Sequence, residues 1–224
     1  MNATTLKILG IIAMTIDHIG FFLFPQITIL RVIGRLTYPI FAYMIAEGCS
    51  HTRNKVRYLC TMLGVGCICS AVTYFAGGSL YQSVFTTFSC SIILIIALEK
   101  AMRARESAQR ICRFCIAAVI TFLFFITFRI GVIPGFETDY GFFGIITPVL
   151  VWLGNSKAEK LMGLAAGLCF ISMELGAIQW CSLAAIVFLY LYNGERGKHS
   201  LKWFFYGYYP LHIAVLYGMA QFIL

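Results

Sequence analysis

Two ionisable residues, Asp17 and His18, lie past the middle of the first apolar segment, LKILGIIAMTIDHIGFFLF. Adjacent residues on a helix point about 100° apart, so the two cannot both face lipid, and at least one faces the helix bundle. A histidine titrates near neutral pH and can remove a proton from a hydroxyl, amine or thiol, while a carboxylate can orient its ring. The pair therefore indicates either a general base, His18 oriented by Asp17, or a buried Asp–Arg pair with His18 as a hydrogen-bonded neighbour.

A second polar stretch, residues 31–53, is apolar enough to enter a bilayer but carries charges along its length. Its polar residues and its proline recur every four positions, at Arg31, Arg35, Pro39, Tyr43, Glu47 and His51. On one continuous helix they form a slowly winding stripe, with Arg35 and His51 roughly 24 Å apart along the axis at about 1.5 Å per residue. Charged side chains inside a membrane-spanning helix usually face a bundle interior or a wet cavity. The stripe predicts the lining of a cavity or of a narrow passage.

Basic residues gather where this stretch ends. Arg53 and Arg57, with Lys55 and His51, suit the phosphates of an anionic ligand, because a guanidinium group binds phosphate oxygens through a bidentate fork. Glu47 and His51 are four residues apart and can equally form an ordinary ion pair along a helix. Basic residues at this place also fit the positive-inside rule, so both interpretations stay open.

A third group of polar residues lies near the end of the sequence. Residues 192–197, YNGERG, indicate a tight turn through their Asn–Gly and Arg–Gly pairs. The sequence YPLH follows at residues 209–212. His212 lies about nine residues into the last apolar segment, which places a second histidine at a depth comparable with that of His18.

Composition predicts the elements that must position these residues. Hydrophobic residues make up 60% of the chain and charged residues 12%, which is typical of an all-α, polytopic transmembrane bundle. Breaks at charged, Pro and Gly positions divide the chain into about nine spans. Their limits are 5–24, 28–50, 56–77, 80–99, 111–133, 140–155, 158–175, 177–193 and 203–223. We expect one integral-membrane domain over residues 1–224, with a first span that is not a cleaved signal peptide.

The basic residues predict the orientation of the spans. Fourteen of the seventeen, including Lys7, fall at the N terminus or in one set of alternate loops, so this side and the N terminus are expected to be cytoplasmic. The exceptions are Arg31, Arg35 and Arg129. The net charge of +8 therefore reflects topology, and no nucleic-acid partner is expected. Most of the nine cysteines lie in apolar segments and lack a second Cys or His pair, so no metal is expected.

Motifs spread along the whole chain resemble the TraX family of integral-membrane proteins, which is implicated in N-acetylation of conjugative pilin. They are Leu6–Lys7 with Asp17–Gly20, Gly34–Leu36 with Tyr38–Phe41, Glu47–Gly48, His51–Asn54, Tyr192–Gly194 with Arg196–Gly197, and Phe205–Tyr206 with Tyr209–His212. The order and spacing of these motifs make the match specific. We expect an integral protein of a bacterial-type cytoplasmic (inner) membrane.

The TraX family is in turn similar to a wider group of membrane acyltransferases, which includes the type-3 acyltransferases and heparan-glucosaminide acetyltransferase. The shared features are a histidine in the first helix, an Arg–Pro–Phe-rich second helix and a late Tyr–Pro–Leu–His sequence. That similarity implies acetyl-CoA as the donor, taken from the cytoplasm, and an acceptor at or across the membrane. His18 would match the catalytic histidine of those enzymes.

The residues and the resemblance together predict an acetyl-CoA-dependent N- or O-acetyltransferase. His18 is the expected base, Asp17 orients it, and Arg35 stabilises the oxyanion that develops in acyl transfer. Four further residues are expected around substrate: Arg31, Tyr38, Tyr209 and His212. The donor is expected to contact Tyr43, Glu47, His51, Arg53, Arg57, Asn193 and Arg196, with Lys198 beside them. The other partners are membrane lipid and an acceptor left open by the sequence: a peptide or pilin N terminus, a glycan or a lipid headgroup.

A proton-coupled transporter or flippase is the alternative function. Its proton relay would consist of Asp17, Glu47, His51 and His212, since chains of carboxylates and histidines serve pumps in this way. The sequence shows neither an inverted repeat nor paired broken helices, which mark many transporters.

Overall fold

A computed structural model describes residues 1–197 and 202–223, and over these residues the chain is all-α, with one isolated β-bridge. The fold class predicted from the sequence is confirmed. The helices group into two compact units, Met1–Met44 with Lys157–Leu224 and Ile45–Ser156. The sequence-based prediction of one domain over the whole chain stays a prediction.

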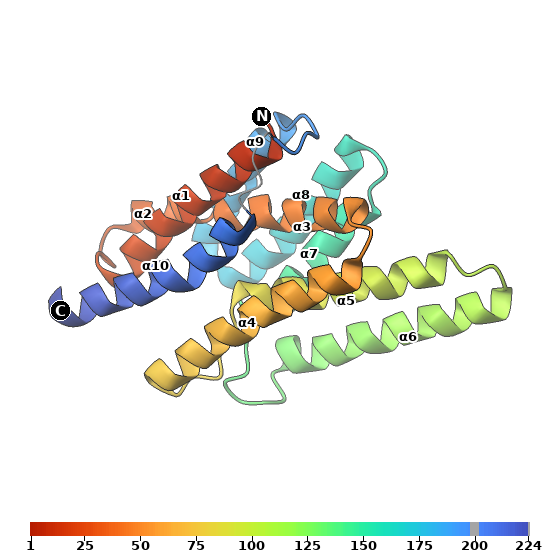
Figure 1. The fold of residues 1–224 in the computed structure, drawn as a ribbon, viewed down its shortest axis with the longest axis horizontal. Helices are drawn as coiled ribbons and strands as arrows, with labels where there is room; N and C mark the ends of the chain where they lie inside the picture. The colour runs from red at the N-terminus through yellow and green to blue at the C-terminus, as the bar shows by residue number, and fades with distance from the viewer. Residues whose placement is uncertain (198–201, 224) are drawn as a thin grey trace. The chain divides into compact units, whose positions relative to one another are not determined.

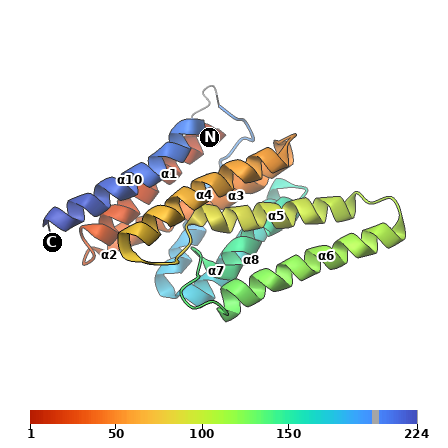
Figure 2. The same ribbon diagram turned by 60° about the horizontal axis from the view of Figure 1, so that its bottom comes forward.

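The first unit contains the residues around Asp17 and His18 (Figure 1). Its elements are α1 (Ala3–Phe22), α2 (Thr28–Gly34), the start of α3 (Thr37–His51), α8 (Lys157–Leu175), the 3₁₀ helix η2 (Ala177–Ala184), α9 (Ala185–Tyr190) and α10 (Lys202–Ile223). The side-chain oxygen of Asn2 accepts a hydrogen bond from the N–H of Thr5 at 2.9 Å, which caps the start of α1. In both views α10 and α2 lie along α1 (Figures 1 and 2).

Glycines allow α1 and α2 to approach closely. A Cβ atom built on Gly20 would lie 2.7 Å from the Cβ of Leu30, and one on Gly34 would overlap the side chain of Asp17. Small residues at helix interfaces are typical of membrane bundles, where close packing drives helix association. The Asp17 carboxylate is therefore held against the backbone of α2.

The second span predicted from the sequence is not one helix. α2 ends at Gly34, residues 35–36 form a turn, and α3 begins at Thr37. Pro39 has no N–H to donate to the carbonyl of Arg35, and its ring would crowd that carbonyl, so the ladder of helical hydrogen bonds breaks there. The predicted stripe therefore does not run along one continuous helix, while the separation of about 24 Å between Arg35 and His51 stays a prediction. Arg31 lies before the break, Arg35 at it, and the other members after it.

The second unit consists of helices that follow one another up and down, so that α5 and α7 run in the same direction. Its elements are the end of α3, α4 (Lys55–Gly77), α5 (Val84–Met102), α6 (Ser107–Phe125), the π-helix η1 (Ile126–Ile130) and α7 (Gly141–Leu153). α5 runs beside α4, α6 and α7 (Figures 1 and 2) and is more buried than α4 or α6. At one end of α5, the Nζ of Lys55 lies 2.7 Å from both carboxylate oxygens of Glu99. This ion pair fixes the start of α4 to the end of α5.

Two connecting segments meet at the other end of α5. The N–H of Gln82 donates to the carbonyl of Glu137 at 2.7 Å, within a parallel bridge between Gln82 and Thr138. The hydroxyl of Tyr81 donates to Oδ1 of Asp139 at 2.7 Å. The segments before α5 and before α7 are thereby joined.

The helices agree closely with the spans predicted from the sequence, and each of the nine predicted segments is largely helical over the described residues. In that part of the chain five segments are long and apolar enough to cross a membrane: Ala3–Phe22, Thr28–His51, Lys55–Phe75, Val84–Met102 and Ser107–Ile130. Gly141–Leu153 and Ala177–Tyr190 are shorter apolar helices. These features are those of a membrane protein, while the nine-span topology and its orientation stay predictions.

Candidate active site

The rings of His18 and His212 are in contact between α1 and α10, inside the first unit. Nδ1 of His18 lies 2.6 Å from Nε2 of His212, and the ring centroids are 4.9 Å apart. The other ring nitrogen of His212, Nδ1, lies 2.9 Å from the carbonyl oxygen of Tyr208, one turn earlier on α10. His212 is only 7% exposed. The two histidines and a backbone carbonyl thus form a part-buried chain of hydrogen bonds.

This chain assigns the protons of the neutral pair. A carbonyl oxygen only accepts hydrogen bonds, so Nδ1 of His212 carries the proton donated to Tyr208, and Nε2 of His212 is an acceptor. His18 must then donate from its Nδ1, and its Nε2 keeps a free lone pair. One ring nitrogen is held by an orienting partner and the other is left unprotonated, which is the state a general base requires.

Asp17 contacts two arginines of the neighbouring elements. Its carboxylate lies 2.8 Å from Nη1 of Arg31 and 3.4 Å from Nη2 of Arg35. The sequence left a buried Asp–Arg pair open as an alternative, and the structure contains it. The expected role of Asp17 in orienting His18 needs correction, because His212 supplies the hydrogen bond to that ring. Asp17 instead neutralises two guanidinium groups, whose burial without a partner would cost several kcal/mol.

Arg35 lies in the turn between α2 and α3 and contacts a second irregular element. Its Nη1 donates to Oε1 of Gln179 on η2 at 3.1 Å, and its Nε donates to the carbonyl of Arg31 at 3.3 Å. η2 is a 3₁₀ helix that follows Gly176, whose φ is +92°. Irregular backbone at membrane depth is tolerated where it is buried in protein or lines a wet cavity. Two interruptions of the helices meet at the Arg35–Gln179 contact.

Two buried polar groups on η2 have no hydrogen-bond partner among the described residues. They are Nε2 of Gln179, in a residue that is 1% exposed, and Oγ of Ser182, in a residue that is 0% exposed. Since the Oε1 of Gln179 is held by Arg35, its amide N–H groups are directed away from that contact. Buried donors are nearly always satisfied in folded proteins, so an unpaired donor beside an arginine is a candidate ligand contact.

Tyrosines surround the histidine pair. The Tyr209 ring meets the rings of His18 and His212 edge-on, with centroids 6.2 Å and 5.5 Å away. The Tyr208 ring stacks on His212 at 5.0 Å, and its hydroxyl is 2.8 Å from Oγ1 of Thr15. Tyr209 therefore lies beside the histidines, and its expected place near substrate stays a prediction. Tyr38 is buried at the start of α3, at 1% exposure.

The loop that contains Asn193 and Arg196 packs on the start of α1. The N–H of Asn193 donates to the carbonyl of Met1 at 2.9 Å, and Oγ1 of Thr4 donates to the carbonyl of Arg196 at 3.0 Å. The rings of Tyr43 and Tyr192 meet edge-on at 6.1 Å, which brings α3 to the same loop. These three predicted donor contacts are close together in the first unit. Lys198 lies outside the described residues.

The remaining predicted donor contacts belong to the second unit. His51 is exposed, and its Nδ1 lies 2.9 Å from the carbonyl oxygen of Glu47 and 3.8 Å from Oε2 of the Glu47 carboxylate. The second contact has the geometry of the ordinary ion pair along a helix that the sequence left open. The ammonium group of Lys55 forms an ion pair with Glu99. The guanidinium groups of Arg53 and Arg57 are exposed and, within the described part of the chain, have no side-chain partner. These two remain available for an anion.

Comparison with known proteins identifies the family of this chain. The model of a family described as TraX protein matches residues 2–220. The chain belongs to the TraX family. A curated relative, the probable fimbrial assembly protein FimC, serogroup H1, of Dichelobacter nodosus, is 25% identical over 99% of this chain and 97% of that protein. An uncharacterized protein of Rickettsia prowazekii (strain Madrid E) is 58% identical over 38 residues, 17% of this chain and 15% of that protein. No solved structure matches.

One residue of the TraX site was missed at the sequence level. Gln179 was read only as part of an apolar span over 177–193, although an amide within such a span is itself a signal of a polar contact. Its partner Arg35 is 144 residues away in the chain, so no local spacing relates the two. The site in the first unit thus consists of His18, His212, Arg35 and Gln179, with Asp17 and Arg31 as the ion pair behind Arg35.

Proposed function

We propose that this TraX-family protein is a membrane-embedded acetyltransferase that moves an acetyl group from acetyl-CoA to an amine or hydroxyl acceptor. The observation that carries the proposal is the hydrogen-bond chain from the Tyr208 carbonyl through His212 to His18, which leaves Nε2 of His18 unprotonated. A structural role would not require a part-buried histidine whose second ring nitrogen has no hydrogen-bond partner among the described residues. Proton removal from an acceptor does require it.

The residues present fit a CoA donor in two respects. Arg53 and Arg57 are exposed guanidinium groups without side-chain partners among the described residues, and such groups bind phosphates. The buried amide of Gln179 has free N–H donors for an acyl oxygen. Acetyl-CoA supplies an acetyl group activated as a thioester. Asn193, Arg196 and Tyr43, which lie close together in the first unit, are separate candidate contacts for the donor.

His18 moves the proton in this reaction. Its Nε2 accepts the proton of the acceptor amine or hydroxyl as the new bond to the acetyl carbon forms and the carbon–sulfur bond breaks. The same nitrogen then returns the proton to the leaving thiolate. His212 keeps its Nε2 toward the Nδ1–H of His18 throughout, so it holds the ring in place and stabilises the imidazolium that forms transiently.

Gln179 and Arg35 are suited to the negative charge that develops on the acyl oxygen. Preorganised donors in a dry site are typically the largest single contribution to acyl-transfer catalysis. Asp17 and Gln179 hold the Arg35 guanidinium in a fixed orientation, so little reorganisation is needed when charge appears. The amide N–H of Gln179, on the buried side of its contact with Arg35, would donate a hydrogen bond to the same acyl oxygen.

The acceptor belongs to pilus or fimbria assembly in this proposal. The basis is the family together with the relative named as a probable fimbrial assembly protein. A pilin N terminus is the first candidate, and a glycan or a lipid headgroup presents the same kind of nucleophile. We place the enzyme in the cytoplasmic (inner) membrane, where cytoplasmic acetyl-CoA has access to it.

The decisive test follows CoA release by purified protein with acceptor present. His18→Gln is expected to lower the turnover about 10²-fold to 10⁴-fold, the usual contribution of a general base. His212→Gln should lower it less, because the base survives but loses its orienting partner. Thr15→Ala, which removes a hydrogen bond between α1 and α10 without touching either ring, is the control and should retain turnover. Undiminished turnover in His18→Gln would exclude the proposed base.

The acceptor is found by mass spectrometry of envelope fractions from cells with and without this protein. Acetylation adds about 42 Da to the modified molecule, as expected from the acetyl group that CoA carries. A pilin that lacks this increment only in cells without the protein would identify the substrate. The same comparison on extracted lipids and glycans separates the other two acceptor classes.

One observation favours the alternative, a proton-coupled transporter or flippase. The turn between α2 and α3 and the 3₁₀ helix η2 are two interrupted helices that meet at Arg35 and Gln179. Paired broken helices carry the substrate sites of many transporters. Against it, Asp17 is already neutralised by Arg31 and Arg35. Flux into proteoliposomes that depends on a proton gradient would favour the transporter, and heat of binding with acetyl-CoA would favour the enzyme.

A further inference from the structure

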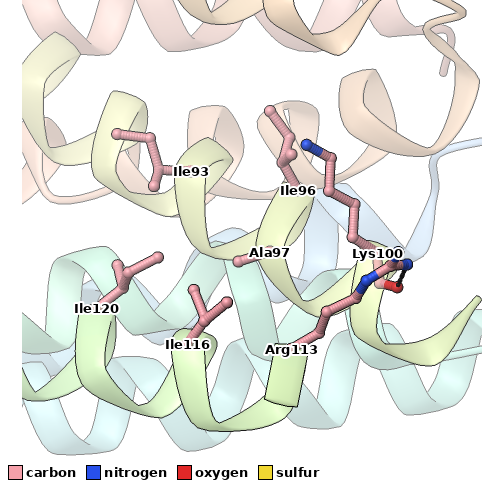
Figure 3. Close-up of a pocket in the computed structure, with 7 residues that line it drawn as sticks. All are labelled: Ile93, Ile96, Ala97, Lys100, Arg113, Ile116 and Ile120. Carbon is pink, nitrogen blue, oxygen red and sulfur yellow. Dashed lines mark hydrogen bonds between the residues drawn. The ribbon is translucent and has the colours of Figure 1, made fainter. Parts of the chain in front are cut away.

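A groove lies between α5 and α6, within the second unit and apart from the histidine site. Its volume is about 630 Å³, and Figure 3 shows its two walls facing one another. Ile93 and Ile96 stand on α5, and Ile116 and Ile120 stand on α6. Lys100 and Arg113 lie together at one end of the groove (Figure 3).

The charged end of the groove is uncompensated. The Nη1 of Arg113 donates to the carbonyl of Lys100 at 2.9 Å, which leaves most of its N–H groups unused. Neither Lys100 nor Arg113 pairs with a carboxylate in the part of the chain that the structure describes. The neighbouring Glu99 is already held by Lys55 and Arg103. Two positive charges therefore lie at one end of the apolar groove.

Further positive charge surrounds this end. Arg103 and Arg105 lie in the connection from α5 to α6, and Arg110 lies in the first turns of α6. Basic pockets between membrane helices, at the level of the headgroups, are typical binding places for acidic phospholipids. A free inorganic anion would leave the isoleucines without a partner, and a neutral apolar ligand would leave both cations without one. An amphiphile with an anionic head satisfies both parts of the groove.

We propose that the groove between α5 and α6 binds an anionic phospholipid, with its phosphate against Lys100 and Arg113 and an acyl chain along the four isoleucines. The site is independent of acetyl transfer. α6 has little support from the protein itself, since Ala117 is its one buried residue among those described. A bound lipid adds contacts to this helix, and a ligand that binds the folded state stabilises it by mass action.

Native mass spectrometry of the purified full chain tests the proposal. The probes are phosphatidylglycerol and phosphatidylcholine with identical acyl chains, titrated separately in detergent. Phosphatidylglycerol should bind at one saturable site and raise the unfolding temperature, whereas phosphatidylcholine should do neither. The double variant Lys100→Gln with Arg113→Gln should weaken phosphatidylglycerol binding roughly thirtyfold, or about fivefold for each charge removed.

Two further variants keep the result interpretable. Arg105→Gln with Arg110→Gln removes the same charge from residues outside the groove and should weaken phosphatidylglycerol binding clearly less than the groove variant does. Ala97→Phe fills the apolar part without changing charge and should weaken binding of the whole lipid. Because the Arg113 side chain also contacts the end of α5, Lys100→Gln alone provides the charge test in a chain with that contact intact.

Three results would overturn the proposal. The first is equal binding of both lipids by the unmodified protein. The second is an equal loss of affinity in the groove variant and in the Arg105/Arg110 control, which would indicate diffuse surface charge. The third is full displacement of phosphatidylglycerol by excess glycerol 3-phosphate, which would indicate a site for a soluble anion.

Discussion

At the scale of single residues, the candidate site depends on which side chains are hydrogen-bond or ion-pair partners of one another. The sequence singled out Asp17, His18, Arg35 and His212 because polar residues within an apolar segment are conspicuous, and in the structure all four are buried or partly buried in the first unit. It could not assign their partners. His18 and His212 are 194 residues apart, and only the docking of α10 along α1 brings their rings together. A carboxylate adjacent in sequence was the natural choice for the orienting group, yet adjacent positions on a helix face different neighbours.

Gln179 provides a residue-scale prediction. Gln179→Glu keeps an oxygen for Arg35 but replaces the amide donor, so it should lower the turnover about tenfold to a hundredfold or more, as loss of an oxyanion donor does. The measurement is CoA release at saturating donor and acceptor. Ser182→Ala, which removes the other unpaired polar atom of η2, is the control and should leave turnover and folding unchanged. Equal activity of Gln179→Glu and the unmodified protein would remove Gln179 from the catalytic step.

At the scale of elements, the length of the apolar segments predicted where helices form. It did not predict where a helix is interrupted. Each predicted apolar segment is largely helical over the described residues, because about 20 apolar residues can satisfy their backbone in a bilayer only as a helix. The four-residue spacing from Arg31 to His51 nevertheless suggested one uninterrupted helix. Pro39 was counted as a member of that stripe, although a proline removes the hydrogen bond to the residue four positions earlier. That residue is Arg35, whose side chain contacts η2 from the resulting turn.

The two joined segments that precede α5 and α7 provide a second prediction, also at the scale of elements. Tyr81 precedes α5, outside the apolar helices of the structure, and the residue is 39% exposed. Partial desolvation of its hydroxyl, together with the Asp139 carboxylate that accepts its hydrogen bond, raises the pKa of Tyr81. A phenol with a raised pKa in the folded state contributes stability that is present below its ordinary value near 10, and that stability is lost as the pH rises above it. The unfolding temperature should therefore fall between about pH 9 and about pH 11.

The variant Tyr81→Phe isolates this contribution. It loses the hydrogen bond to Asp139, worth about 1 kcal/mol, at neutral pH. It should also decline less steeply than the unmodified protein in alkaline solution. Tyr74→Phe changes an exposed tyrosine of α4 and serves as the control. Parallel alkaline curves for Tyr81→Phe and the unmodified protein would contradict the assignment.

At the scale of the whole molecule, charge distribution indicates how the chain crosses the membrane. Positive residues gather around the connection from α5 to α6, whereas the segment before α7 carries Glu137 and Asp139. The structure places these two segments at opposite ends of α5, since Glu137 bonds to Gln82 just before that helix begins. A helix of 19 residues is about 28 Å long, close to the thickness of a hydrocarbon core. The positive-inside rule then assigns the basic end to the cytoplasm.

Cysteine labelling in whole cells tests this topology. In a chain whose own cysteines are replaced by Ser or Ala, Glu137→Cys should react with a membrane-impermeant maleimide in intact cells. Arg105→Cys should react only after the membrane is permeabilised, because both residues are exposed but lie at opposite ends of α5. Labelling after permeabilisation controls for the intrinsic reactivity of each position. If Arg105→Cys reacts in intact cells and Glu137→Cys does not, the chain is inverted, and a donor from the cytoplasm could not approach Arg53 and Arg57.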